Sequence, residues 1–129
     1  MLGVVASGAR YIAYEPNTET YKHLKELVSF LGIQNEVELY NEDSGKVDFP
    51  THDLVLTSPP YYNLEIYSQE ETQSENQFDT YEEWREEWLF PLARNSAEHS
   101  KIICWNVANV GKMKLRDDLI QYLNSLGWQ

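Results

Sequence analysis

The segment Ser58-Pro59-Pro60-Tyr61 combines residue types that can present a rigid set of hydrogen-bond acceptors to a ligand. Two consecutive prolines fix φ and remove two amide donors, so the carbonyl groups of this turn are free to point into a cleft. The Ser58 hydroxyl and the Pro59 carbonyl could then hold both hydrogens of a planar amino group, as on cytosine or adenine. Accepting both hydrogens favours a more tetrahedral nitrogen, whose lone pair can attack a methyl group.

Tyr61 adds a ring that could stack on a base once that base has left the helix stack. The alternative interpretation of the whole segment is structural: the proline pair simply ends a strand, and the tyrosines pack at its rim. The choice between the two depends on the elements that position the turn.

Hydrophobic periodicity predicts strands at 10–15, 36–41, 53–57 and 101–107. It predicts helices at 18–32, from Thr80 onward, and from Leu115 to Gly127, with Gly8 closing a short helix before the first strand. In the first long helix, Thr18 is the expected cap and Gly32 the expected end. This order, with strands that are continuous apolar runs, favours an α/β fold: a mostly parallel sheet with helices on both faces.

Details of the second half follow from spacing. Thr80 and Glu83 form a capping box, and the helix that follows carries an aromatic stripe that we expect to pack into the core rather than form an exposed patch. Pro91 should kink or end the regular part of that helix. Residues 63–79 are polar and lack glycine, which predicts a mobile loop. The aromatic stripe consists of Tyr81, Trp84, Trp88 and Leu92.

Ligands of such sheets bind beyond the carboxyl ends of the strands, and two further strand ends carry acids. Glu15 ends the first strand, where a carboxylate can accept hydrogen bonds from the hydroxyls of a ribose; the alternative is a solvated surface glutamate. Glu42, Asp43 and Ser44 follow the second strand, where Asp43 could accept a hydrogen bond from an adenine amino group. The alternative there is an Asx turn leading into Gly45.

Composition sets outer limits. The 129 residues fit one domain with a core of its own. The single cysteine, Cys104, lies in an apolar run and is expected to be buried, so neither a disulfide framework nor a zinc site is predicted, and no metal is expected. No apolar run approaches the length of a membrane span and no secretory signal is visible, which predicts a cytoplasmic protein without a membrane partner. The net charge of −11, without a basic patch, is unusual for a protein that grips a phosphate backbone.

The sequence resembles the N-4/N-6 class of DNA amino-methyltransferases, which use S-adenosyl-L-methionine (SAM). The resemblance is carried by "YIAYEPN", "YNEDS" and "DLVLTSPPYYNLEIYS", and it extends to "TYEEWREEWLFPLAR" and "ICWNV", so it covers nearly the whole chain. The family signature is Asp, Asn or Ser followed by Pro-Pro and an aromatic residue. Its serine form, present here, occurs mostly with methylation of cytosine N4.

The resemblance implies a class I, Rossmann-like methyltransferase fold and a methyl transfer from SAM to the exocyclic amino group of a DNA base, cytosine N4 favoured over adenine N6. It implies a place near the cleft for Asn106. The other implied residues fall into two groups, the target-base side with Ser58, Pro59, Pro60 and Tyr61, and the cofactor side with Glu15, Pro16, Glu42, Asp43 and Ser44.

The chain also departs from the family pattern. The glycine-rich SAM loop, which should precede Glu15 by some twenty residues, is missing, and no region that reads a DNA sequence is visible. We therefore expect residues 1–129 to form a single partial catalytic domain, truncated at its N-terminus and at its C-terminus, with weak SAM affinity and low or no turnover. Contacts to DNA would come from regions largely absent from this acidic chain, and whether a restriction enzyme accompanies it stays open.

Two alternatives remain. An asparagine form of the turn occurs in methyltransferases that act on RNA or on glutamine side chains of proteins, so those substrates are possible acceptors. The chain could instead be a non-catalytic, degenerate subunit of an assembly. A missing strand would leave an unpaired sheet edge, through which a homodimer could form.

Overall fold

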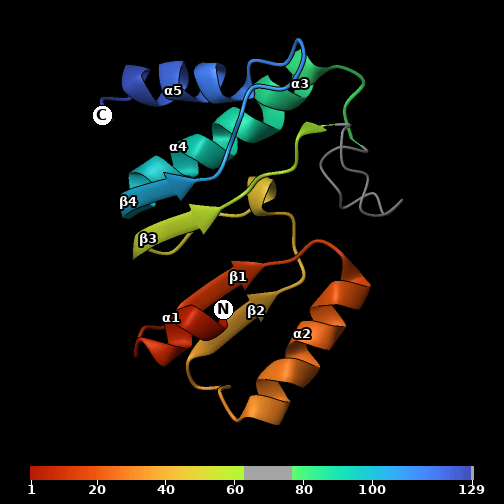
Figure 1. The fold of residues 1–129 in the computed structure, drawn as a ribbon, viewed down its shortest axis with the longest axis vertical. Coiled ribbons are helices and arrows are strands. Elements are labelled where there is room, and N and C mark those ends of the chain that lie inside the picture. Colours follow the sequence, from red (N-terminus) through yellow and green to blue (C-terminus); the bar gives the residue numbers. More distant parts are fainter. Residues whose placement is uncertain (63–76, 129) are drawn as a thin grey trace. The chain divides into compact units, whose positions relative to one another are not determined.

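The computed structural model of the chain describes residues 1–62 and 77–128 (Figure 1). Most of the loop predicted at 63–79 therefore lies outside the described residues. The chain divides into two compact units, an N-terminal unit, Met1–Ser44, and a C-terminal unit, Gly45–Gln129. Each is a mixed α/β unit that contains one short parallel sheet. The expectation of one domain over residues 1–129 stays a prediction.

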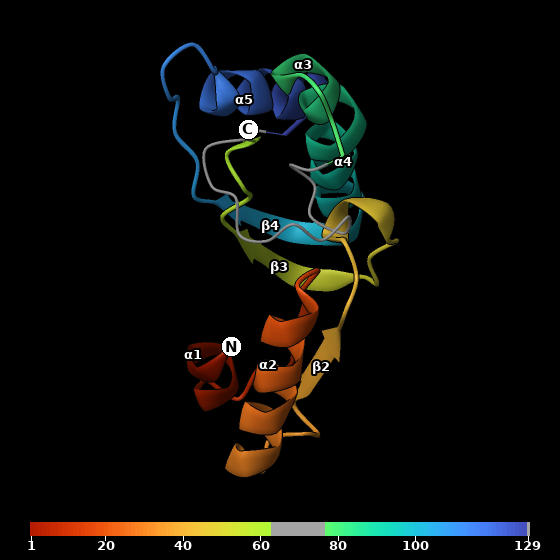
Figure 2. The ribbon, with the colours of Figure 1, turned by 90° about the vertical axis from the view of Figure 1, so that its right-hand side faces the viewer.

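The N-terminal unit is a strand–helix–strand unit preceded by a short helix. Its strands pair in parallel, with Tyr11 opposite Val37 and Tyr14 opposite Tyr40, and the rings of the latter pair stack at 5.3 Å. The longer helix runs alongside the second strand (Figure 2) and contacts it. The elements of this unit are α1 (Leu2–Ala6), β1 (Tyr11–Tyr14), α2 (Thr18–Leu31) and β2 (Val37–Tyr40).

The ends of α1 and α2 follow from individual residues. Asn17, not Thr18, caps α2, because its extended backbone lets its side chain accept a hydrogen bond from the Thr20 amide. Gly32 ends α2 with φ 68°, as predicted. Gly8, with φ 81°, follows α1 and confirms the expected glycine at that end.

The C-terminal unit contains one parallel pair of strands, β3 and β4. In that pair Thr57 lies opposite Trp105. Helix α4 packs on β4, and α5 packs on α4 (Figure 1). A 3₁₀ turn, η1 (Ser44–Lys46), lies where the two units join. The elements are β3 (His52–Thr57), α3 (Tyr81–Trp84), the π-helical turn η4 (Arg85–Leu89), α4 (Phe90–His99), β4 (Ser100–Trp105) and α5 (Leu115–Ser125).

The helix predicted from Thr80 begins as expected but passes through Pro91. The Thr80 hydroxyl accepts a hydrogen bond of 3.2 Å from the Glu83 amide, which confirms the cap. Proline lacks an amide donor, and Pro91 falls in the first turn of α4, directly after η4 has shifted the hydrogen-bond register. The regular helix is therefore interrupted before Pro91 and resumes to His99.

The aromatic stripe of this helix forms the core of the C-terminal unit. Trp84 and Leu89 are fully buried, and Trp88 stacks on Trp84 at 5.3 Å. The expectation that the tryptophans pack inward is thus confirmed. The cluster is completed by Tyr62, Leu92 and Leu115.

The outer face of the β3–β4 sheet differs from expectation. Successive residues of a strand point to opposite faces, and here the outward residues are apolar and exposed: Leu54, Leu56, Ile102 and Cys104. The prediction that Cys104 is buried is wrong, because its side chain lies on this exposed face of the sheet.

The single, mostly parallel sheet is found only in part. Parallel pairing is confirmed in both units, but the strands form two separate two-stranded sheets, β1–β2 and β3–β4. Among the described residues each strand has one partner and keeps one unpaired edge. No helix within the described ranges is long and apolar enough to cross a membrane.

Candidate functional site

The diproline turn (residues 58–61) begins directly after β3 ends. Because β3 and β4 run in parallel, Asn106 follows β4 at the same edge of the sheet. Its backbone amide donates a 2.9 Å hydrogen bond to the Thr57 carbonyl. The structure therefore brings Asn106 beside the start of the turn, at the carboxyl end of the sheet, where ligands of parallel sheets bind.

The turn is anchored on one side and open on the other. Pro59 is buried, whereas the Ser58 side chain is exposed and Pro60 is half-buried. Within residues 1–62 and 77–128, no hydrogen bond reaches the Ser58 hydroxyl or the carbonyls of Pro59 and Pro60. These oxygens are the acceptors that the sequence predicts. Tyr61 is half-buried and packs against the core cluster, so part of its ring is already engaged.

Tyr62, the next residue, is one that sequence reasoning missed. Its φ of 51° lies in the left-handed region, which a bulky side chain adopts only under constraint, and it is the one such residue other than glycine in the described part of the chain. The side chain is 8% exposed and donates a hydrogen bond to the Phe78 carbonyl at 3.3 Å. The tandem tyrosine after the proline pair was the available signal, but nothing in it indicates the backbone conformation.

Glu15 occupies the corresponding place in the N-terminal unit, after β1. Its amide donates to the Tyr40 carbonyl at 2.9 Å, which extends the β1–β2 ladder by one bond. Its Oε1 accepts a 2.8 Å hydrogen bond from the Asn17 amide, whereas no bond to Oε2 is found within the described ranges. The carboxylate thus has a fixed orientation and keeps an oxygen for a ligand.

Asn41, directly after β2, was also missed. Its side-chain amide donates to the Glu15 carbonyl at 2.8 Å and to the Pro16 carbonyl at 3.3 Å. It therefore ties the loop after β1 to the end of β2. An asparagine between a strand and the acids that follow was the available signal for this role.

The acids after β2 divide by burial. Glu42 is exposed, whereas Asp43 is only 8% exposed, and Ser44 begins η1. Because β1 and β2 are adjacent and parallel, these residues leave the sheet at the same edge as Glu15. The structure thus groups the residues predicted for the cofactor side at one end of the N-terminal unit: Glu15, Pro16, Glu42, Asp43 and Ser44.

This end of the N-terminal unit is electronegative. Partial burial raises the pKa of the Tyr14 hydroxyl, and the neighbouring Tyr40, Glu42 and Glu38 raise it further. The pKa of Tyr40 is raised as well, first by its 3.0 Å hydrogen bond to Glu38. Such an edge favours a ligand that carries positive charge.

Two hollows of the C-terminal unit lie elsewhere, along α4 and α5. No residue of the diproline turn lines either of them. Both are open and have walls of mixed charge, so we do not favour them over the strand ends as the site. The smaller, about 310 Å³, is lined by Arg85, Phe90, Asp118, Gln121, Tyr122 and Ser125. The larger, about 560 Å³, is lined by residues that include Lys46, Glu86, Arg94, Asn95, Glu98 and His99.

The predicted residues thus form two groups, each at the carboxyl end of a parallel strand pair in its own unit. The cofactor-side group lies in the N-terminal unit and the target-base group in the C-terminal unit. Comparisons with known protein families, with curated proteins and with solved structures find no match to this chain.

Proposed function

We propose that this chain is the catalytic part of a SAM-dependent DNA amino-methyltransferase of the class I, Rossmann-like type. Its target is the exocyclic amino group of a base, cytosine N4 in preference to adenine N6. The observation that carries the proposal is the diproline turn: three oxygen acceptors that no hydrogen bond from the described residues reaches, at the carboxyl end of β3 and beside Asn106.

The chemistry needs little acid or base catalysis. The Ser58 hydroxyl and the Pro59 carbonyl accept the two hydrogens of the amino group, and this pairing directs the nitrogen lone pair away from the base plane. The proton that nitrogen loses after transfer passes to solvent. The chain contributes orientation and a fixed set of dipoles, which lower the barrier more than proton transfer does in reactions of this kind.

The residues of the N-terminal unit fit the proposed cofactor in chemical type. Glu15 offers Oε2 and the second lone pair of Oε1 to the ribose hydroxyls, and Asp43 offers a carboxylate for the adenine amino group. The electronegative edge around Tyr14 and Glu42 suits the cationic centres of SAM. When bound, SAM would supply a methyl group made electrophilic by its sulfonium, and the sulfur would keep the electron pair of the broken S–CH3 bond.

The net charge of −11 limits how this chain meets DNA. An acidic surface does not grip a phosphate backbone, so the proposed contact is confined to an unstacked base held at the turn. Single-stranded DNA, in which no base pair has to open, is therefore the substrate of choice for a first assay.

The test is methyl transfer from labelled SAM to single-stranded DNA, with RNA and a glutamine-containing peptide as competing acceptors. Because the glycine-rich SAM loop is missing, we expect only a low rate of labelling in DNA at high SAM concentration, with N4-methylcytosine exceeding N6-methyladenine in the digested product. Ser58→Ala should lower the transfer rate about 10-fold or more, because it removes one of two acceptors for the amino group. Ser29→Ala removes an exposed serine hydroxyl of α2 and should leave the rate unchanged.

If only RNA or only the peptide is labelled, that acceptor and not DNA is the substrate. Absence of label in every acceptor, together with no heat of SAM binding in calorimetry, would overturn the proposal and leave a non-catalytic subunit. Heat without transfer would show that the cofactor site exists and that the turn does not act on an amino group.

A further inference from the structure

Two aromatic side chains of the C-terminal unit, Tyr81 and Trp84, pack against the left-handed Tyr62 and are called the aromatic wall below. Its ring centroid lies 6.4 Å from that of Tyr81, in an edge-to-face arrangement, and 6.1 Å from that of Trp84. A bulky residue with φ of 51° persists only where its surroundings over-determine it. These ring contacts, together with the hydrogen bond from the Tyr62 hydroxyl to the Phe78 carbonyl, surround the residue that follows the diproline turn.

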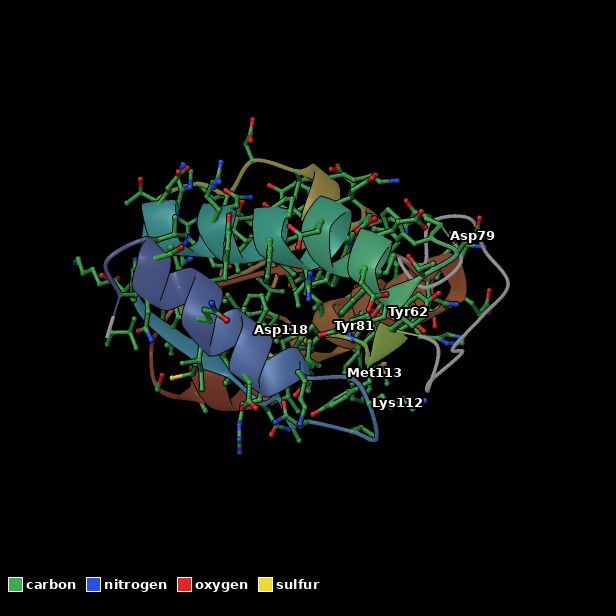
Figure 3. The ribbon with its side chains drawn as sticks, turned by 90° about the horizontal axis from the view of Figure 1, so that it is seen from above. Tyr62, Asp79, Tyr81, Lys112, Met113 and Asp118 are labelled. Atoms are coloured by element: carbon green, nitrogen blue, oxygen red, sulfur yellow. The ribbon has the colours of Figure 1, made fainter. Side chains whose placement is uncertain are left out.

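The wall is itself fixed from the opposite side, by α5. The Tyr81 hydroxyl donates a 2.9 Å hydrogen bond to Asp118 Oδ2, and the same oxygen accepts a 3.0 Å bond from Arg85 Nη1. The guanidinium of Arg85 also lies over the Tyr81 ring, 5.8 Å from its centroid. Figure 3 shows Tyr81 between Tyr62 and Asp118.

The hydrogen bond between Tyr81 and Asp118 has a carboxylate acceptor, and at 2.9 Å it is longer than most bonds of this type. Both side chains are partly buried, which limits competition from water. Burial raises the pKa of Tyr81 well above its usual value, and the bond to Asp118 raises it further. The hydroxyl therefore stays a proton donor throughout the ordinary pH range.

We propose that the Tyr81–Asp118 hydrogen bond holds Tyr62 in its left-handed conformation and so fixes the diproline turn for methyl transfer. Tyr81 and Asp118 are then positioning residues, which act through Tyr62 and touch neither substrate nor cofactor. This role in catalysis rests on the proposed function, whereas the effect on Tyr62 does not.

The test compares Tyr81→Phe and Asp118→Asn with the unaltered chain in two measurements. The first is the backbone chemical shifts of Tyr62, which distinguish the left-handed from the extended conformation; we expect them to move toward extended values in both variants. The second is methyl transfer, for which we expect kcat to fall about 10-fold while KM for SAM changes less than about twofold. A general loss of folding would change both constants and many resonances.

Tyr122→Phe is the matched control. Tyr122 lies one turn after Asp118 on α5, and its hydroxyl also takes part in a hydrogen bond, accepting from Arg94 Nε at 3.1 Å. Its replacement should leave the Tyr62 shifts and kcat unchanged. Unchanged Tyr62 shifts in Tyr81→Phe and Asp118→Asn would overturn the inference, as would shifted resonances with an unaltered kcat. If the unaltered chain transfers no methyl group, the proposed function fails, and the shifts alone decide whether the bond fixes Tyr62.

Discussion

Gly45 lies so close to the indole of Trp88 that a Cβ atom on Gly45 would overlap the ring. Trp88 is a core residue of the C-terminal unit, and Gly45 belongs to the 3₁₀ turn η1 that enters this unit. The glycine is required here for space, because its φ is not in the left-handed region. The packing of the core thus reaches back to the residues that follow Asp43.

Gly45→Ala should destabilise the C-terminal unit by about 1–3 kcal/mol, the usual cost of forcing an extra methyl group into a packed core. Urea unfolding followed by tryptophan fluorescence measures this, because all of the chain's tryptophans, Trp84, Trp88, Trp105 and Trp128, belong to this unit. We expect a lower midpoint with an unchanged slope.

Gly3→Ala is the control for this substitution. A Cβ on Gly3 meets nothing within 4 Å, and the residue lies within α1 of the N-terminal unit. The fluorescence transition should stay where it is. A Gly45→Ala chain as stable as the unaltered one would show that the Trp88 ring has room to move.

Much of the fold could be predicted from local patterns. Apolar spacing at β1, α2 and β3 and the cap at Thr80 depend on neighbouring residues only, and these elements form where expected. The prediction for Cys104 failed because burial depends on what covers a sheet. The run "KIICW" has the composition of a strand buried on both faces, but Ile102 and Cys104 are exposed on one face of β4.

The exposed Cys104 should react with a thiol reagent in the folded chain. Because its side chain is open to solvent, we expect a rate within about tenfold of that in denaturant. A buried thiol would react only after local or global unfolding exposes it, several orders of magnitude more slowly than in denaturant. Colour release with a disulfide reagent measures the rate, and Cys104→Ser, which leaves no thiol in the chain, should release none. Slow reaction limited by unfolding would mean that this face of the sheet is covered in solution.

The candidate site was predictable only as residue types. The proline pair, Glu15 and Asp43 were identified because their chemistry is visible in single positions. The roles of Asn41 and Tyr62 were not, since each depends on a contact or a backbone angle that forms only when distant segments meet: Asn41 bonds to Glu15, and Tyr62 packs on Tyr81.

Asn41→Ala should loosen the loop that carries Glu15. The variant loses the side-chain bonds to the carbonyls of Glu15 and Pro16, and one net hydrogen bond of about 1 kcal/mol corresponds to about fivefold faster opening. Hydrogen exchange of the Glu15 amide, which is bonded to Tyr40, reports this opening. Asn35→Ala, at an exposed position before β2, should leave that exchange rate unchanged. If the Glu15 amide exchanges at the same rate in both variants, Asn41 does not order the loop.

The ion pair between Asp53 and Lys101 makes the stability of the folded chain depend on pH, with a sign that follows from the two pKa shifts. Lys101 Nζ lies 2.7 Å from Asp53 Oδ1 on the neighbouring strand, and this hydrogen bond, with the charge behind it, lowers the pKa of Asp53 and raises that of Lys101. A lowered carboxylate pKa adds stability above the value for the unfolded chain, about 3.9, and that stability is lost as the pH falls through the folded value. The raised lysine pKa adds stability below about pH 10.4, which is lost as the pH rises through the folded value.

Both side chains are largely exposed, so the effect on stability is small, and titration of the Asp53 carboxyl carbon by NMR is the direct measurement. Lys101→Gln should raise the pKa of Asp53 toward its usual value, because it removes the largest cause of the lowering. Lys112→Gln, at an exposed position in the loop before α5, should leave the pKa lowered. Added salt should shrink the difference between these variants, because ions screen exposed charges. A pKa of Asp53 that does not respond to Lys101→Gln would show that the two strands do not hold this pair together in solution.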